Sequence, residues 1–105
     1  MKLEKCIIGK LTQNNYQRVY QLFETNSPFF SIPIDYFLRG TLTDDGFNPE
    51  LSLILFEPTE NEPIAALIVV VRPKINDNYC FFKGCVVDKD YQRQGVGSFM
   101  LNELF

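Results

Sequence analysis

The sequence has 105 residues, which is enough for one domain and too few for two. Hydrophobic residues make up 46% of the chain and charged residues 22%, so it can form a packed core rather than stay disordered. The net charge is −3 and no run of Lys or Arg occurs, which argues against a nucleic-acid partner. Because the chain has no His and no Cys-x-x-Cys pair, it predicts neither a metal site nor a His-based catalytic triad.

Membrane and export signals are also missing from the pattern of residues. The longest apolar run, Ile64 to Val71, is far shorter than the roughly 20 residues that span a bilayer, and the first residues lead into no signal-peptide stretch. The three cysteines give no disulfide framework, since Cys80 and Cys85 would point to opposite faces of a strand. We therefore expect no membrane partner, reduced cysteines and a cytoplasmic location.

The first part of the chain predicts a short strand followed by two helices. Glu4 to Ile8 has strand character, and Thr12 offers a side-chain oxygen that could cap a helix. The apolar positions of that helix are Tyr16, Val19, Tyr20 and Phe23. Asn26-Ser27-Pro28 ends it, and Pro33 can open a second, shorter helix that Gly40 ends. The residues expected to share one face of this second helix are Ile34, Phe37 and Leu38.

The second part of the chain predicts three strands in an antiparallel meander. Turn-forming residues fill Thr41 to Pro49, after which the hydrophobic period becomes that of strands. The expected strands are Leu51 to Glu57, Ile64 to Arg72 and Tyr79 to Val87. The polar linker Pro58 to Pro63 is as short as a hairpin requires, and a turn is expected around Asn76-Asp77-Asn78. The predicted fold class is α+β (α/β): a mixed sheet that contains the meander, with the helices packed on it.

A glycine-containing loop follows the last expected strand. It reads Gln92-Arg93-Gln94-Gly95-Val96-Gly97, and Ser98 to Phe105 then has helical propensity. The apolar face expected for this helix is Phe99, Leu101, Leu104 and Phe105. The first N–H groups of a helix lack an intrahelical acceptor and lie at the positive end of its dipole, so they bind phosphate. Gly95 and Gly97 can take φ values closed to other residues and leave room for a diphosphate beside the main chain. This order of strand, glycine loop and helix predicts a phosphate site.

Other glycine-loop signatures fit this segment less well. The dinucleotide fingerprint requires a third glycine where Met100 stands, and the P-loop requires a Gly-Lys-Ser/Thr sequence that the chain lacks. The hexapeptide resembles the signature of the GNAT (Gcn5-related N-acetyltransferase) superfamily, which is Gln or Arg, two residues, Gly, one residue, and Gly or Ala. The resemblance extends upstream through Cys85 to Tyr91, which is similar to the family's strand end and the short loop leading to an aromatic residue. The expected order of elements also matches the amino-terminal part of that domain.

The resemblance implies an N-acetyltransferase that moves an acetyl group directly from acetyl-coenzyme A (acetyl-CoA) to an amine acceptor. Main-chain amides from Arg93 to Ser98 would hold the pyrophosphate, and main-chain groups of Val86 and Val87 would pair with the pantetheine arm. The cofactor-binding residues that it implies are Val86, Val87, Gln92, Arg93, Gln94, Gly95, Val96, Gly97 and Ser98. It assigns no side chain of this sequence as general base, and the usual general acid would lie after Phe105, so the catalytic residues stay unknown.

Several other side chains lie near the expected site. The aromatic residues Phe29, Phe30, Tyr36 and Phe37 fall where the resemblance would put the wall of the acceptor site, although helix packing accounts for them more simply. Lys83 and Asp88 lie near the expected reactive centre, but charges at strand ends are commonly just solvated. The Arg93 guanidinium is another candidate phosphate ligand, for which the main-chain amides are the better choice.

Domains of this family continue through a complete third helix and further strands. We therefore expect a single, incomplete domain that has no turnover by itself and that self-associates through the open edge of the strand Tyr79 to Val87. Two functions stay open: an N-acetyltransferase or part of one, and a non-catalytic acyl-CoA-binding or interaction module. A structural domain in which the glycine pair only makes a tight turn is a third alternative.

Overall fold

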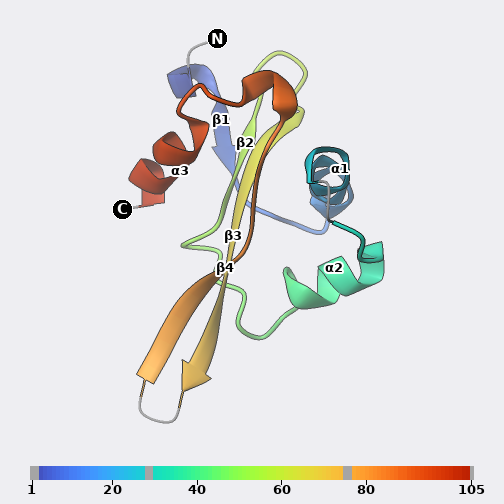
Figure 1. Ribbon diagram of the computed structural model, residues 1–105, viewed down its shortest axis with the longest axis vertical. Coiled ribbons are helices and arrows are strands. Elements are labelled where there is room, and N and C mark those ends of the chain that lie inside the picture. The colour runs from blue at the N-terminus through green and yellow to red at the C-terminus, as the bar shows by residue number, and fades with distance from the viewer. Residues whose placement is uncertain (1–2, 28–29, 75–76, 105) are drawn as a thin grey trace.

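A computed structural model of the protein describes residues 3–27, 30–74 and 77–104, leaving aside the side chains of residues 4 and 72–83. The chain begins and ends with helical elements, and three consecutive strands lie in its second half (Figure 1). The helices are the short 3-10 helices η1 (Leu3–Lys5) and η2 (Lys89–Tyr91) and the α-helices α1 (Tyr16–Asn26), α2 (Ile34–Gly40) and α3 (Val96–Leu104). The strands are β1 (Ile7–Gly9), β2 (Leu53–Phe56), β3 (Pro63–Lys74) and β4 (Asp77–Val87).

The strands form one 4-stranded sheet in the order β1-β2-β3-β4. All three pairings are antiparallel, so the α+β class and the meander are confirmed, while no parallel pair of a mixed sheet occurs among the described strands. The connections from β2 to β3 and from β3 to β4 are too short for the crossover that a parallel pair needs. The turn expected around Asn76-Asp77-Asn78 falls at the connection between β3 and β4, but Asp77 and Asn78 already pair with Lys74 and Pro73 within β4, and Asn76 lies outside the described residues.

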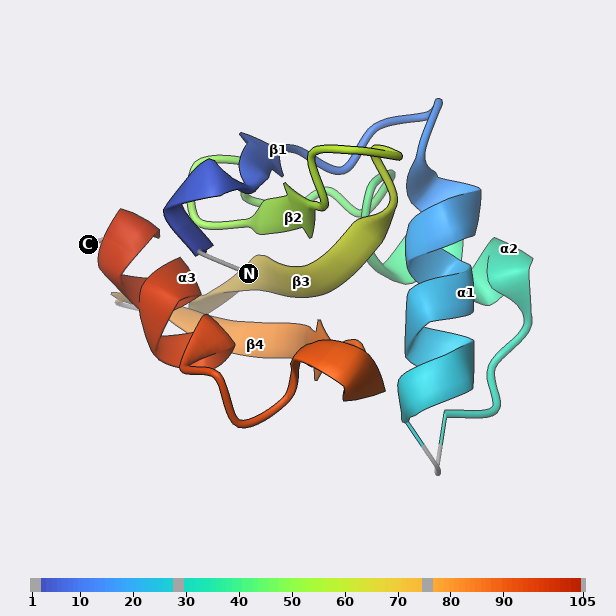
Figure 2. The same ribbon diagram turned by 90° about the horizontal axis from the view of Figure 1, so that it is seen from above.

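Helices cover both faces of the sheet, so the molecule has three layers (Figure 2). On one face α1 and α2 pack on the sheet through a core cluster that also contains Ile54, Phe56, Ala66, Ile68 and Val86. The helical residues of this cluster are Val19, Leu22, Phe23 and Phe37. The four residues of β2 are all buried, because its alternate side chains enter the two opposite cores.

The second core holds α3 against the other face. Val96 and Met100 are 3% and 0% exposed and pack with Leu53, Leu55 and Leu67 of the sheet. Leu101, which we expected on the apolar face of this helix, is 40% exposed instead. The helix also starts at Val96 rather than at Ser98, and this earlier start sets which side chains face the sheet. Phe105, named with the same face, lies outside the described residues.

The amino-terminal elements differ from the prediction at their ends. The strand expected from Glu4 begins at Ile7, after η1. Thr12 does not cap α1, because residues 13–15 form a turn and the helix begins at Tyr16. In that turn Asn14 N–H donates to Thr12 Oγ1 (3.3 Å) and Thr12 N–H donates to Asn15 Oδ1 (2.8 Å), so the Thr12 oxygen is used locally.

The second helix was predicted more closely than the first. Pro33 occupies the N-cap position of α2, and the helix ends at Gly40 as expected. Of the expected apolar face, Phe37 is buried but Ile34 is 36% exposed. None of the described helices is long and apolar enough to cross a membrane. The cytoplasmic location stays a prediction.

The packing of α3 can be tested by truncating Met100. Replacing Met100 by Ala removes a fully buried side chain, and we expect the free energy of unfolding to fall by about 2 to 5 kcal/mol. The control is Leu101→Ala, which truncates the neighbouring, half-exposed side chain. This variant should change the free energy of unfolding by only about 0.5 kcal/mol. Urea denaturation followed by circular dichroism measures both values. Equal losses in the two variants would contradict this orientation of α3.

Candidate functional site

Local hydrogen bonds shape the segment between β4 and α3. The Asp88 carboxylate accepts from Asp90 N–H (2.9 Å) and its main-chain oxygen accepts from Tyr91 N–H (2.8 Å), which folds η2. Lys89 N–H donates to Asn26 Oδ1 (3.0 Å) at the carboxyl end of α1. Asp88 therefore serves as a cap and, together with Lys89, fixes the point at which the chain leaves the sheet.

Tyr91 anchors the segment to the core beneath α3. Its ring is half-buried and packs against the cluster that contains Val96 and Met100. Burial raises the pKa of the Tyr91 phenol, and the Glu57 and Asp88 carboxylates raise it further. Burial also raises the pKa of the nearby Cys6 thiol, with a further contribution from Glu57. Both groups are therefore neutral at pH 7, and they contribute to packing rather than to charge.

The loop reverses the chain through two residues with positive φ. Arg93 has φ 65° and Gly95 has φ 76°, so the glycine relieves one of two left-handed positions. Gly97 does not share that conformation, contrary to our expectation, because it already lies in the first turn of α3. A Cβ added at Gly97 would meet no heavy atom within 4 Å. What Gly97 contributes is open space beside the main chain.

The first turn of α3 has main-chain N–H groups that lack an acceptor within the helix. Phe99 N–H donates to Gly95 O (2.9 Å), which is the first main-chain bond of the helix. The N–H groups from Gly95 to Ser98 are therefore those that a helix leaves without an acceptor of its own. The Val96 side chain is buried while Ser98 is exposed, so the first turn of α3 packs on the core on one side and faces solvent on the other. This is the arrangement that binds a phosphate.

The two expected pantetheine residues are not equivalent. Asp88 N–H donates to Ile64 O (2.7 Å), and since the direction of main-chain groups alternates along a strand, those of Val86 face β3. Those of Val87 and Cys85 face away from β3, at an edge that pairs with no other described strand. The Gln92 side chain crosses this edge, where Nε2 donates to Val87 O (3.0 Å). Only Val87 of the expected pair is therefore placed to meet a ligand through its main chain.

The other predicted side chains surround the loop. Gln92, Arg93 and Gln94 are all exposed, and Gln94 Nε2 donates to Asp90 O (3.2 Å), which closes the loop on itself. The Lys83 side chain lies outside the described part of the structure. Among the side chains that the structure describes, no three of Cys, Asp or Glu form a group that could hold a metal ion.

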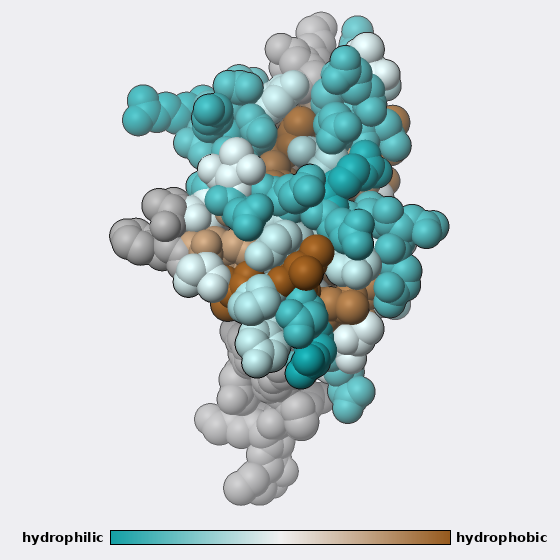
Figure 3. Space-filling view, turned by 90° about the vertical axis from the view of Figure 1, so that its right-hand side faces the viewer, coloured by the Kyte–Doolittle hydropathy of each residue, from teal (hydrophilic) through white to brown (hydrophobic). Residues whose placement is uncertain are grey.

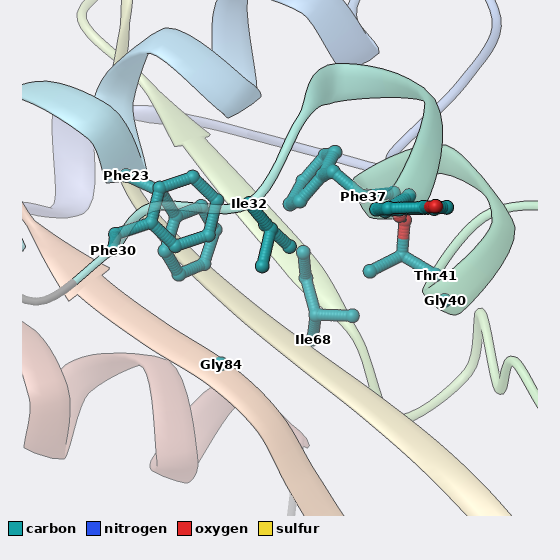
Figure 4. Close-up of a pocket in the computed structure, with 9 residues that line it drawn as sticks. Phe23, Phe30, Ile32, Phe37, Gly40, Thr41, Ile68 and Gly84 are labelled. Atoms are coloured by element: carbon teal, nitrogen blue, oxygen red, sulfur yellow. The ribbon is translucent and has the colours of Figure 1, made fainter.

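A pocket of about 300 Å³ lies on the opposite face, between α1, α2 and the sheet (Figure 4). Its walls come from α1, from the segment before α2, from α2 itself and from the two strands β3 and β4. The lining residues are Phe23, Phe30, Ile32, Tyr36, Phe37, Gly40, Thr41, Ile68 and Gly84. Helix packing does account for Phe37 and Phe30, which lie in and against the core, and together with Tyr36 they also line this pocket. Phe29 lies outside the described residues.

Gly84 was missed in the sequence although it shapes the pocket. A Cβ at this position would lie 2.7 Å from Cε1 of Phe23, so the glycine is what lets that ring rest on β4. Close by, the β3–β4 register shifts between Ile68 and Val69, whose partners are Gly84 and Phe82. The signal was available, because an isolated glycine in an apolar strand indicates a close approach or a bulge.

The comparisons with known proteins agree with this geometry. The model of the Acetyltransferase (GNAT) family matches residues 16–105, which is most of the chain, and the protein therefore belongs to this family. The family uses acetyl-CoA as its acetyl donor. No curated protein has a matching sequence.

Several solved structures share the fold. One is the ribosomal-protein-S18-alanine N-acetyltransferase from Escherichia coli, with a TM-score of 0.69 and 18% identity over 94% of this chain. Another is an aminoglycoside acetyltransferase from an uncultured soil metagenomic sample in complex with trehalose, with a TM-score of 0.69 and 22% identity over 95% of this chain. The NatB acetyltransferase complex bound to CoA and MES gives a TM-score of 0.70 and 12% identity over 92% of this chain.

The chain is shorter than these relatives. It spans 56% of the Escherichia coli enzyme, 67% of the aminoglycoside acetyltransferase and 61% of the matched NatB chain. At these identities the likeness shows the fold. The structures therefore confirm the arrangement of sheet, loop and helices that the GNAT resemblance implied, and the reaction and substrates of the whole protein remain matters for a proposal.

The different roles of the two loop glycines can be tested through stability. Replacing Gly95 by Ala puts a Cβ on a residue with φ 76°, and we expect a loss of about 1 to 2 kcal/mol in the free energy of unfolding. Replacing Gly97 by Ala adds a methyl group in open space within a helix and should stabilise the protein by up to about 1 kcal/mol. Thermal unfolding of the two variants compares them. A larger loss for Gly97→Ala would show that the helix does not begin at Val96.

Proposed function

We propose that the protein binds acetyl-CoA at the loop before α3 and takes part in acetyl transfer to an amine. The main-chain amides from Arg93 to Ser98 hold the pyrophosphate, and Gln92 and Gln94 fix the loop that presents them. The observation that carries this proposal is the free edge of β4, which connects the amino terminus of α3 to the pocket at Gly84.

The β4 edge provides an extended path from the loop to the pocket. From Val87 to Gly84 an extended strand covers about 10 Å, at about 3.3 Å for each residue. The main-chain groups of Val87 and Cys85 face outward along this stretch, so that one residue pairs with an amide group of the arm and the N–H of the other stays free for the thioester. A thioester carried by the arm then lies at the mouth of the pocket, where the acceptor amine meets it.

The reaction follows from this alignment. The amine nitrogen attacks the thioester carbonyl carbon, so a C–N bond forms, the C–S bond breaks and the CoA thiolate leaves, while the nitrogen loses a proton to a base. An outward N–H of β4, from Cys85 or Val87, polarises the carbonyl and stabilises the oxyanion. Holding both reactants in attack geometry supplies much of the rate. The pocket beside the β4 edge favours this reading over a non-catalytic acyl-CoA-binding module, which requires no acceptor site.

The open edge also supports an association between two copies of the chain. The outward main-chain groups of β4 have no partner strand among the described residues, and such edges pair with a strand of another chain. Self-association through β4 would cover the same groups that we assign to the pantetheine arm. Acetyl-CoA and a second copy therefore compete for this edge.

Substitution of Gly97 tests the proposed site. In Gly97→Glu a carboxylate enters the space left beside the first turn of α3, and we expect acetyl-CoA binding to be abolished by its bulk and negative charge. Gly97→Ala is the control, since its methyl group carries no charge and reaches only a short way into that space. Titration calorimetry measures both affinities. Unchanged affinity in Gly97→Glu would refute the site.

A further inference from the structure

The pocket beside Gly84 has walls of hydrocarbon. Five of its lining residues are Phe23, Phe30, Ile32, Phe37 and Ile68, and the close-up shows their side chains converging on one space (Figure 4). The surrounding surface over α1 and α2 is mainly hydrophilic, with a hydrophobic patch near its centre (Figure 3). A mostly apolar pocket within a polar surface is typical of a ligand site.

Two polar groups at the pocket already have partners. Thr41 Oγ1 donates to Phe37 O (2.6 Å), and Ile32 O accepts from the Tyr20 phenol (2.6 Å). No lining residue among those described carries a carboxylate. The Asp35 carboxylate on α2 is paired with Arg39 (3.3 Å) at the surface, and the guanidinium of Arg39 lies 5.2 Å from the centre of the Tyr36 ring. The charges of this pair offset one another, and the described lining residues offer no carboxylate to a polycationic ligand.

Aromatic contacts hold the pocket in shape. The Tyr20 ring lies edge-on to Phe30 and to Phe37, with centroids 5.4 and 5.5 Å apart, and Phe23 stacks on Phe30 at 5.5 Å. The bond from the Tyr20 phenol to Ile32 O ties the segment before α2 to α1. A cavity of about 150 Å³ with similar walls accepts benzene, so the 300 Å³ here can accept a ring with a short alkyl chain.

We propose that this pocket takes the apolar body of the acceptor, so that the acceptor is a primary amine joined by a short alkyl chain to an aryl or branched alkyl group. This inference rests on the proposed function and names the substrate class of that site. The amine end lies toward Gly84, the lining residue that belongs to β4, whose edge holds the arm. Apolar surroundings disfavour the ammonium form of the bound amine and so favour the free base that attacks the thioester. Polyamines and aminoglycosides bind more weakly, because each further ammonium placed in the pocket would lack a partner.

Binding of two amine probes tests the substrate class. In titrations of the wild-type chain, 2-phenylethylamine should bind at least about tenfold more tightly than spermidine, which corresponds to about 1.4 kcal/mol. In Ile32→Trp the indole ring fills the pocket from a residue that is 42% exposed, so we expect the 2-phenylethylamine affinity to fall about tenfold or more with the fold intact. The matched control is Ile34→Trp, at an isoleucine that is 36% exposed and does not line the pocket, and it should change nothing.

A second variant and a second ligand make the result decisive. Ile32→Asp places a carboxylate at the pocket and should raise the spermidine affinity relative to that of 2-phenylethylamine. Equal affinity of the wild-type chain for the two amines, or an unchanged 2-phenylethylamine affinity in Ile32→Trp, would overturn the inference. Titration of the same samples with acetyl-CoA separates the two proposals. If acetyl-CoA binds the wild type but not Gly97→Glu and the amine result is negative, the substrate class alone fails. If acetyl-CoA does not bind and the amine result is positive, the proposed function fails and the pocket remains an amine site.

Discussion

The burial of the central strands on both faces is the constraint on which the rest of the structure depends. Every residue of β2 is buried, and the successive residues Ile54 and Leu55 are 0% exposed in opposite cores. A strand of this kind needs a helical layer on each side. Since α1 and α2 occupy one side, the chain must pass around the β4 edge to put α3 on the other. The turn that makes this passage is the candidate acetyl-CoA loop.

This origin of the loop explains why it is both rigid and open. Tyr91 and Val96 enter the core on either side of it, so its ends are fixed by packing. Between them, the left-handed residues Arg93 and Gly95 complete the reversal within a few positions, which directs the first turn of α3 toward the edge of the sheet. Burial of the side chains and exposure of the amides are thus two results of one chain path. A main-chain anion site of the kind proposed for this loop requires no polar side chain.

The sequence predicted the elements whose signals are local and missed those that depend on packing. Strand positions follow from alternating or continuous apolar runs, and the loop follows from Gln92, Gly95 and Gly97. The apolar face of α3 was misjudged, because Met100 or Leu101 becomes buried according to where the helix starts and how it docks. Thr12 has a suitable side chain for a cap, but Asn15 Oδ1 accepts from Thr12 N–H and forms a local turn before the helix. The pocket requires residues from α1, α2, β3 and β4, whose meeting no single segment encodes.

Packing and binding turn out not to be alternatives for the aromatic residues near α2. Phe37 is buried in the core, where its ring contacts Tyr20 and Phe23, and it also lines the pocket. Large rigid rings at centroid distances of 5.4 to 6.1 Å cannot fill the space between a helix pair and a twisted sheet, and the remaining space is the pocket. Gly84 sets its depth by admitting the Phe23 ring to the surface of β4. The same contacts that hold α1 and α2 on the sheet therefore fix the shape of the proposed acceptor site, so the site is formed before any ligand arrives.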